Sequence, residues 1–168
     1  MSEFYYAGGR KVELDRATDY VAVVEQTARE AGLDARVQKS SEEGSRRGGG
    51  VVLVERSALD EKTLATLRDV GALQPVYRKD RAVMVPLPEV RVEFDTPAQH
   101  QAVLDTLTHR DTPPHKIVQE TDYAMVVQPT SGSGDDAVTL ANEIYERAHP
   151  AAASARFVQF VPKRETGS

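Results

Sequence analysis

A chain of 168 residues has room for one ordinary domain or two small ones, which excludes a large multidomain enzyme. Its 21 Lys and Arg residues are outnumbered by 26 Asp and Glu residues, and the net charge of −5 argues against nucleic acid as the main partner. The hydrophobic content of 40% suffices for a buried core, and the absence of Cys excludes disulfides and thiolate chemistry.

Nothing in the sequence indicates a membrane partner. No apolar run is long enough to span a bilayer, and the first residues, MSEFYYAGGRK, lack the apolar stretch of a signal peptide. We therefore expect a cytoplasmic protein, although a secreted protein whose leader had been removed would have the same sequence.

The first half predicts a β-hairpin followed by an α+β unit. Gly8 and Gly9 separate two short strands and supply the positive φ that a two-residue turn needs. Residues 40–50, with four glycines and no apolar side chain, predict a loop, and Ser57 is a candidate N-cap for the helix that follows. Strands are predicted at 19–24, 35–39, 51–54 and 73–78, and helices at 25–31 and 60–70.

The second half predicts the order strand, helix, strand, strand, helix, strand. Thr96, Pro97 and Gln99 have the types and spacing of a helix N-cap, first helical residue and capping box. Ser133 and the two aspartates after it approach a second helix, which buries one apolar stripe. Strands are predicted at 81–86, 89–94, 117–120, 123–128 and 156–161.

This order is the split βαβ plan of a ferredoxin-like sandwich, and the first half can be interpreted in the same way. We therefore predict an α+β fold of tandem ferredoxin-like (βαββαβ) units, with antiparallel sheets, helices on one face and an N-terminal β-hairpin. The predicted domains are 1–81, with the hairpin and first unit, and 82–168, with the second unit and a C-terminal tail.

Three stretches carry a resemblance to a known family: YYAGGRKVELDRATDYVAVV, PVYRKDRAVMVPLPEVRVEF, and the run from DYAMVV through ANEIYERA to ARFVQFVPK. Together they resemble the N-terminal prodomain of fervidolysin-like subtilisin-family serine proteases over most of the chain. The resemblance implies a non-enzymatic protein that helps such a protease fold and then inhibits it. Its sheet would pack on the catalytic domain, and its C-terminal segment would lie in the substrate cleft.

The sequence departs from that family in three ways. The Asp-Thr-Gly, His-Gly and Gly-Thr-Ser stretches of a subtilase catalytic domain are absent from these residues. The chain would therefore be either a prodomain cut from a longer protein or a free-standing relative that acts in trans on a separately encoded protease. Residues 151–155 are AAASA where the family commonly has an acidic residue and Pro, and the loop at 40–50 is unusually long.

A half-covered sheet explains how such a protein would dock. Alternate side chains of the sheet point away from the helices and must meet water or a partner. Both faces of the last predicted strand carry large apolar groups, so one set is expected on the uncovered face as an interface. The predicted protease-binding residues are Phe157, Val158, Gln159, Phe160 and Val161.

The polar tail that follows has two interpretations. It could lie extended in a protease cleft and pair with the cleft edge by strand addition, or it could be a solvated terminus. The cleft-binding candidates are Pro162, Lys163, Arg164, Glu165, Thr166, Gly167 and Ser168.

Catalytic alternatives have weaker signals. The spacing of His109 and His115 matches no zinc pattern, and His100 lies at the edge of an apolar helical stripe. Ser133 lacks a Gly-x-Ser-x-Gly elbow, and the glycines at 48–50 lack the Lys of a phosphate-binding loop. We expect no catalytic residue, metal or cofactor. The main alternative is an adaptor module that keeps the prodomain fold without a protease, and a small hydrolase or metal enzyme is the third hypothesis.

Overall fold

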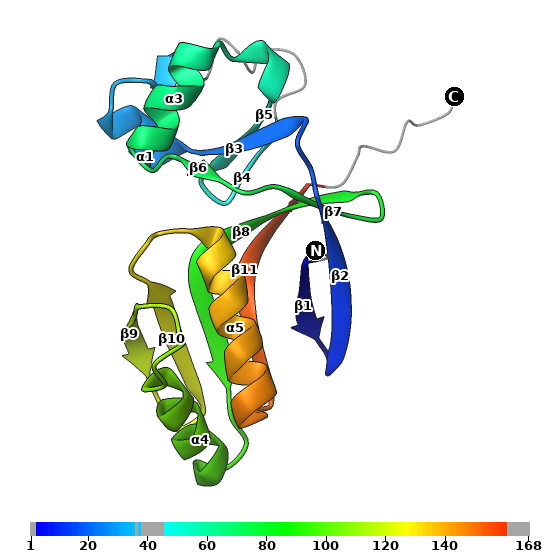
Figure 1. Cartoon of the computed structure of the whole chain (residues 1–168), viewed down its shortest axis with the longest axis vertical. Helices are drawn as coiled ribbons and strands as arrows, with labels where there is room; N and C mark the ends of the chain where they lie inside the picture. The colour runs from blue at the N-terminus through cyan, green and yellow to red at the C-terminus, as the bar shows by residue number, and fades with distance from the viewer. Residues whose placement is uncertain (1–2, 36, 38–45, 161–168) are drawn as a thin grey trace. The chain divides into compact units, whose positions relative to one another are not determined.

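The computed structural model describes residues 3–35, 37 and 46–160 (Figure 1). It is an α+β structure whose strands form sheets with antiparallel pairing. The chain divides into two compact units, each made of two separate segments. We call the unit formed by residues 15–85 and 158–160 the first unit, and that formed by 3–14 and 86–157 the second unit.

This division differs from the predicted boundary between residues 81 and 82. The chain passes between units after Leu14, Val85 and Phe157, and each passage falls inside a strand. A strand that belongs to two units carries no loop or linker composition at the boundary, so the sequence had no signal for it.

The N-terminal hairpin forms as predicted. β1 (Glu3–Ala7) pairs antiparallel with β2 (Arg10–Arg16), and φ is 56° at Gly8 and 77° at Gly9. Positive φ at both central residues is what a two-residue hairpin turn requires, and glycine adopts it without strain.

The main sheet of the first unit, here called the first sheet, has the strand order β4-β5-β3-β6. Helices α1 and α3 and the short 3-10 helix η1 connect its strands. In chain order the elements are β3 (Tyr20–Val24), α1 (Glu25–Glu30), β4 (Arg46–Gly48), β5 (Val51–Glu55), η1 (Arg56–Ala58), α3 (Glu61–Asp69), β6 (Leu73–Gln74) and β7 (Tyr77–Lys79).

Four predictions for the first half were wrong in detail. The single strand predicted at 73–78 is two strands, β6 and β7, which pair with different neighbours. Ala35 and Val37 are helical where a strand was predicted. The glycine-rich segment contains β4, because Gly49 and Gly50 both have positive φ and make a tight turn into β5. Asp60, rather than Ser57, caps α3, since its side chain accepts a hydrogen bond from the Thr63 amide at 2.6 Å.

The second unit has the strand order β9-β10-β8-β11 in what we call the second sheet. If the four strands of each sheet are numbered in chain order, the spatial order in both sheets is second, third, first, fourth. In chain order the elements are β8 (Ala82–Glu93), α4 (Pro97–Leu107), β9 (His115–Glu120), β10 (Ala124–Pro129), α5 (Gly134–Ala148) and β11 (Ala152–Phe160).

The cap of α4 agrees with the sequence prediction, and α5 is capped by Ser133, which the sequence analysis had placed only in the approach to the helix. Thr96 Oγ1 accepts from the Gln99 amide at 3.2 Å, and Ser133 Oγ accepts from the Asp135 amide at 3.1 Å. Three strands are longer than predicted, and β9 is one of them because it begins at His115 rather than at Ile117. β8 is continuous where two strands were expected. β11 already begins at Ala152, although alanine is a weak strand former, and the small side chains of Ala153 and Ala155 are buried in the core.

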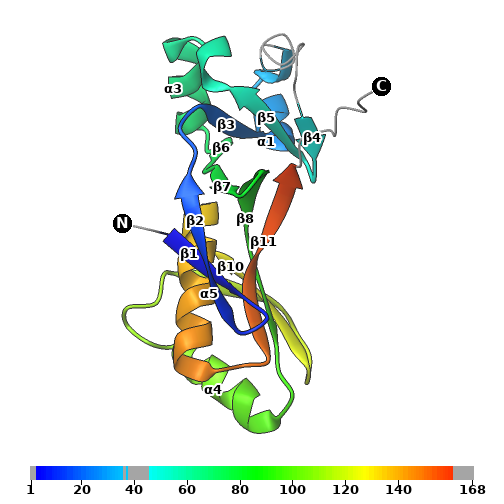
Figure 2. The same cartoon turned by 90° about the vertical axis from the view of Figure 1, so that its right-hand side faces the viewer.

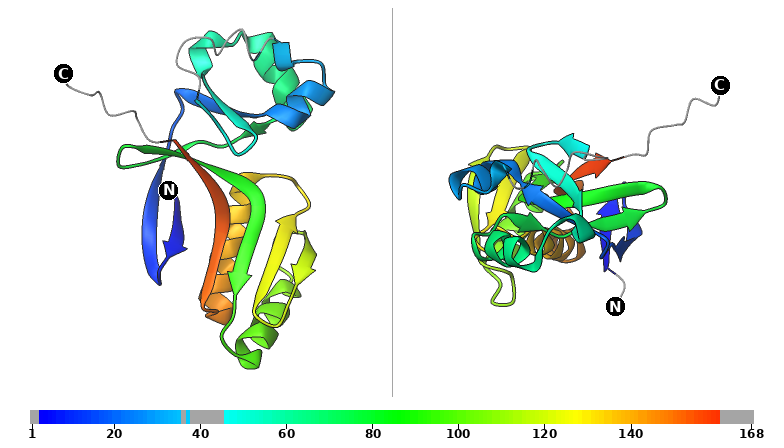
Figure 3. Two further views of the ribbon diagram at one scale, coloured as in Figure 1. Left: turned by 180° about the vertical axis from the view of Figure 1, so that it is seen from behind. Right: turned by 90° about the horizontal axis from the view of Figure 1, so that it is seen from above.

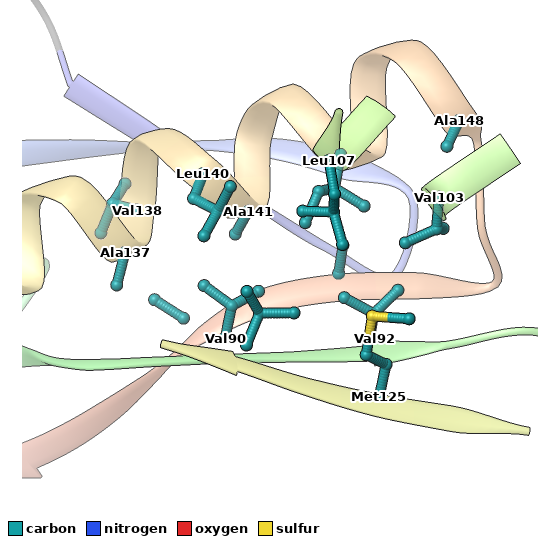
Figure 4. Packing of buried hydrophobic residues seen from close by; sticks show 14 of the residues in the cluster. Val90, Val92, Val103, Leu107, Met125, Ala137, Val138, Leu140, Ala141 and Ala148 are labelled. Carbon is teal, nitrogen blue, oxygen red and sulfur yellow. The ribbon is translucent and has the colours of Figure 1, made fainter. Parts of the chain in front are cut away.

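The core of the second unit lies between its sheet and the helices α4 and α5 (Figure 4). Strand β1 of the hairpin lies beside α5 (Figure 2). No helix of the described residues is long and apolar enough to cross a membrane.

Candidate docking surface

Helices cover the second sheet on one face only. Val90 and Val92 of β8 and Met125 of β10 are fully buried and point toward the helices (Figure 4), and Val127 of β10 is fully buried in the same core. Val103 of α4 meets them from the other side, with the apolar stripe of α5. Each strand therefore places every second residue in this core.

The residues that alternate with these buried ones form what we call the open face. Figure 3, left, shows the second sheet from the side away from α5. Register confirms the assignment, because Arg91 pairs with Val126 and Glu93 with Ala124 across β8 and β10. On β8, β10 and β11 the open face consists of Glu89, Arg91, Glu93, Ala124, Val126, Gln128, Ser154 and Arg156.

Charges of both signs lie on this face. Arg156 Nη1 is 3.5 Å from Glu89 Oε2, joining β11 to β8, and Arg91 Nε is 3.5 Å from Glu93 Oε1. The Arg91 and Arg156 side chains are 70% and 63% exposed. Such exposed pairs contribute little to stability, so these arginines are available to a partner at small cost to the fold.

Two hollows in the open face share Arg91 and Val126. One is also lined by Glu89, Ser154 and Arg156, and the other by Gln119 and Ala124. The side chains of Ser154 and Ala124 are short, which is why the sheet is hollowed between the long arginines. The face thus offers a central apolar group, Val126, surrounded by charged and polar groups.

The large apolar residues predicted for docking lie elsewhere. Phe157 packs against the core on the helix side, with its ring 4.9 Å from the Tyr5 ring. Phe160 is 6% exposed, and Val158 is half-buried. Phe157 and Phe160 are therefore packed within the chain, whereas Val158 stays half-buried and its docking role remains a prediction.

The remaining predicted docking residues lie at the end of β11 and beyond it. Gln159 is exposed at the end of β11. Val161 and the tail candidates, residues 162–168, lie outside the described residues.

The alternation of residue types in β8 indicates the open face already in the sequence, more clearly than β11 does. In the strand VRVEF the charged residues Arg91 and Glu93 alternate with Val90, Val92 and Phe94. This pattern is typical of a strand with one buried and one solvated face.

Aromatic side chains of the hairpin close the side of the second unit. The Tyr6 ring stacks on that of Tyr145 with centroids 4.4 Å apart, and Asn142 Nδ2 donates to the Phe4 carbonyl at 2.8 Å. Burial raises the pKa of the Tyr6 hydroxyl, and the charge of Glu146 adds to the rise.

The histidines have structural surroundings. His100 stacks on Phe94, and its Nε2 lies 2.6 Å from Glu120 Oε2. His109 Nδ1 accepts from the Asp111 amide at 3.3 Å, while His115 Nδ1 lies 2.9 Å from the Pro113 carbonyl oxygen. Within residues 3–35, 37 and 46–160, no group of three or more His, Asp or Glu side chains is arranged to hold a metal ion.

Comparisons with known proteins give no significant match to this chain, whether to a family model, a curated protein or a solved structure.

Proposed function

We propose that this chain is a non-enzymatic, prodomain-like protein that binds a subtilisin-like serine protease as a folding chaperone, a cleft-blocking inhibitor or both. The observation that carries the proposal is the open face, since a sheet covered by helices on one side leaves a broad, shallow surface for a larger partner. The resemblance of the sequence to subtilase prodomains supplies the class of partner.

The fold proposed with this function is a pair of ferredoxin-like units. The order strand, helix, strand, strand, helix, strand from β8 to β11, with the spatial order β9-β10-β8-β11, supports this assignment for the second unit. The first sheet supports it for the first unit, because its spatial order is equivalent.

In the proposed complex, Val126 makes the apolar centre of the contact, and Arg91 and Arg156 pair with acidic groups of the protease. Arginine suits this role because its planar guanidinium forms directed hydrogen bonds with carboxylates. The tail at residues 162–168 follows the end of β11 and is proposed to lie extended in the substrate cleft by strand addition.

Inhibition of peptide hydrolysis by a panel of subtilisin-like proteases tests the proposal. The double variant Arg91→Glu, Val126→Lys should weaken inhibition at least tenfold with only a small loss of melting temperature, because both side chains lie on the open face. The matched control Arg68→Glu, Val70→Lys changes exposed residues on and beside α3 and should inhibit like the wild type. Absence of binding, inhibition and refolding assistance by the wild type would rule the proposal out.

Removal of residues 162–168 tests the tail separately. It should weaken inhibition far more than it lowers the melting temperature. Equal inhibition by the truncated chain would discard the cleft-binding tail while leaving sheet docking intact.

A second candidate function is an adaptor that joins other proteins through the same face. The mixed charges favour it, since polar surfaces suit reversible association better than obligate assembly. Affinity capture from the native host separates the two, because only the first candidate requires a protease in the eluate.

A further inference from the structure

Tyr6 of β1 and Tyr145 of α5 lie face to face in the second unit, although they are far apart in the sequence. Their ring centroids are 4.4 Å apart and the ring planes differ by 22°. Of the six tyrosines in the chain, these are the two whose rings contact each other. Both side chains are half-buried, so each ring stays partly open to solvent.

Contacts on either side of the stacked rings hold β1 on α5 (Figure 2). Asn142 Nδ2 donates to the Phe4 carbonyl at 2.8 Å. The donor lies about one helical turn before Tyr145, and the acceptor lies two residues before Tyr6. The Tyr145 hydroxyl oxygen lies beside the hairpin turn, since a Cβ atom added at Gly9 would be 3.4 Å from it. The two rings are therefore held together by the backbone of the hairpin as well as by their own contact.

The hydroxyl groups of the two tyrosines lie toward the same end of the stack. The pKa of the Tyr6 hydroxyl is raised by burial first, and then by the charges of Glu146 and Tyr145. The charge of Tyr145 has this effect because the two hydroxyl oxygens are close together. The Cε ring carbons, which adjoin the hydroxyl groups, therefore also lie near each other.

We propose that Tyr6 and Tyr145 are a site of oxidative crosslinking, at which a one-electron oxidant joins their Cε atoms into dityrosine. Phenoxyl radicals couple at the carbons beside the oxygen, because the unpaired electron is partly located there. Two phenol rings joined by a single carbon–carbon bond have nearly the same separation between ring centres as this stacked pair. The rings must therefore turn, but they need not approach, and such proximity favours coupling within one chain.

The reaction balances with hydrogen peroxide as the oxidant and a haem peroxidase as the class of catalyst. Each phenol loses one electron and its hydroxyl proton, and the two radicals form one carbon–carbon bond. Each joined carbon then gives up its hydrogen as a proton while the ring oxygen takes one up, which restores both phenols. The two electrons and two protons released overall reduce one hydrogen peroxide to two water molecules.

A link between residues 6 and 145 would act as a covalent staple in a chain that has no Cys and hence no disulfide. It closes a loop through most of the chain, and such a loop stabilises by restricting the unfolded state, as a disulfide does. The link involves no residue of the open face, so it is independent of the proposed protease partner.

Photo-oxidation of the folded full chain with tris(bipyridyl)ruthenium(II) and persulfate, which together remove single electrons from phenols, tests the proposal. Cleavage after glutamate releases Tyr6 in residues 4–13, Tyr145 in 144–146 and Tyr123 in 121–143, so mass spectrometry identifies the joined tyrosines. The wild type should give a monomer in which 4–13 is linked to 144–146 with the loss of two hydrogen atoms. The yield should not depend on chain concentration, because the coupling is intramolecular.

Phenylalanine variants separate the stacked pair from its neighbours. Tyr6→Phe and Tyr145→Phe keep the ring but remove the phenol, and each should lower the yield of the link about tenfold. The matched control Tyr5→Phe should give the wild-type yield, because Tyr5 points to the other side of β1 and packs on Phe157. No link in the folded wild type, a yield unchanged by Tyr6→Phe, or crosslinks formed only between chains would each overturn the proposal.

Urea unfolding of the purified crosslinked monomer tests the staple. It should unfold at a higher urea concentration than the untreated chain, because the link remains in the unfolded state. Oxidised Tyr6→Phe, which has met the same reagents without forming the link, is the control and should unfold like its own untreated form. An unchanged midpoint for the crosslinked monomer would overturn the stabilising role of the link.

Discussion

The two sheets of this protein share a strand order but differ in how their faces are covered. In the first sheet, Val23 and Val52 point into the core shared with α3, yet Ala22 and Leu53, which point the other way, are also 0% and 2% exposed. In the second sheet the corresponding outward positions carry exposed charged groups such as Arg91 and Glu93.

The difference shows that the same arrangement of strands is covered in two different ways. A sheet buried on both faces reads as a continuous apolar run, and β5 is VVLV followed by Glu55. A sheet with one solvated face alternates, as β8 does from Val90 to Phe94. The second sheet is therefore the one that has a face left for a partner.

The largest expected effect comes from truncating matched outward residues in the two sheets. Leu53→Ala should lower the free energy of unfolding by about 2–5 kcal/mol, because it leaves a cavity in a buried site. Val126→Ala, on the open face, should cost under about 1 kcal/mol. Urea unfolding measures both, and equal losses would contradict the assigned difference between the faces.

A second prediction concerns how closely α5 approaches β8 in the second unit. A Cβ atom added at Gly134 would collide with the carbonyl oxygen of Pro86, and backbone cannot move aside as a flexible side chain can. Gly134→Ala should therefore destabilise the protein by about 1–3 kcal/mol. Thr139→Ala, on the exposed side of the same helix, is the control and should be nearly neutral.

Helix caps give a third, smaller pair of effects, one in each unit. Asp60→Ala and Thr96→Ala should each cost about 1 kcal/mol, because each removes the acceptor for a backbone N–H in the first turn. Ser57→Ala should be nearly neutral, since Ser57 lies in η1 and does not cap α3. Thermal unfolding compares them, and a larger loss for Ser57→Ala than for Asp60→Ala would reverse the assignment.

The sequence predicted well wherever one local pattern decided the outcome. The Gly8-Gly9 turn and the Thr96 cap are local signals, and the structure has both. Ser57 and Asp60 are both residue types that can cap a helix. Which of them caps α3 depends on the turn geometry of η1, and the sequence does not determine that geometry.

The last strand shows why the docking residues could not be assigned in the same way. Apolar side chains occur on both faces of β11, so its periodicity does not say which set is covered. Phe157 is covered by Tyr5, from the opposite end of the chain, and such a contact has no local signal. The alternation in β8 was the better guide to the open face.

The smallest expected effect is the pH dependence due to Tyr6. Because burial raises the pKa of Tyr6 in the folded protein, its stabilising contribution is complete below the unfolded pKa of about 10 and is lost as the pH rises through the folded pKa. Tyr6→Phe should therefore lose less stability than the wild type between about pH 9 and pH 11. Identical pH slopes in urea unfolding would show that Tyr6 does not contribute.

The most direct test of the central claim is a map of backbone amide chemical shifts in the labelled chain on adding an inactivated subtilisin-like protease. Our account predicts that, apart from the tail, the perturbed amides cluster in Glu89, Arg91, Val126, Ser154 and their neighbours on β8, β10 and β11. Perturbations confined to β3 and β5 of the first sheet, or none at all, would contradict it.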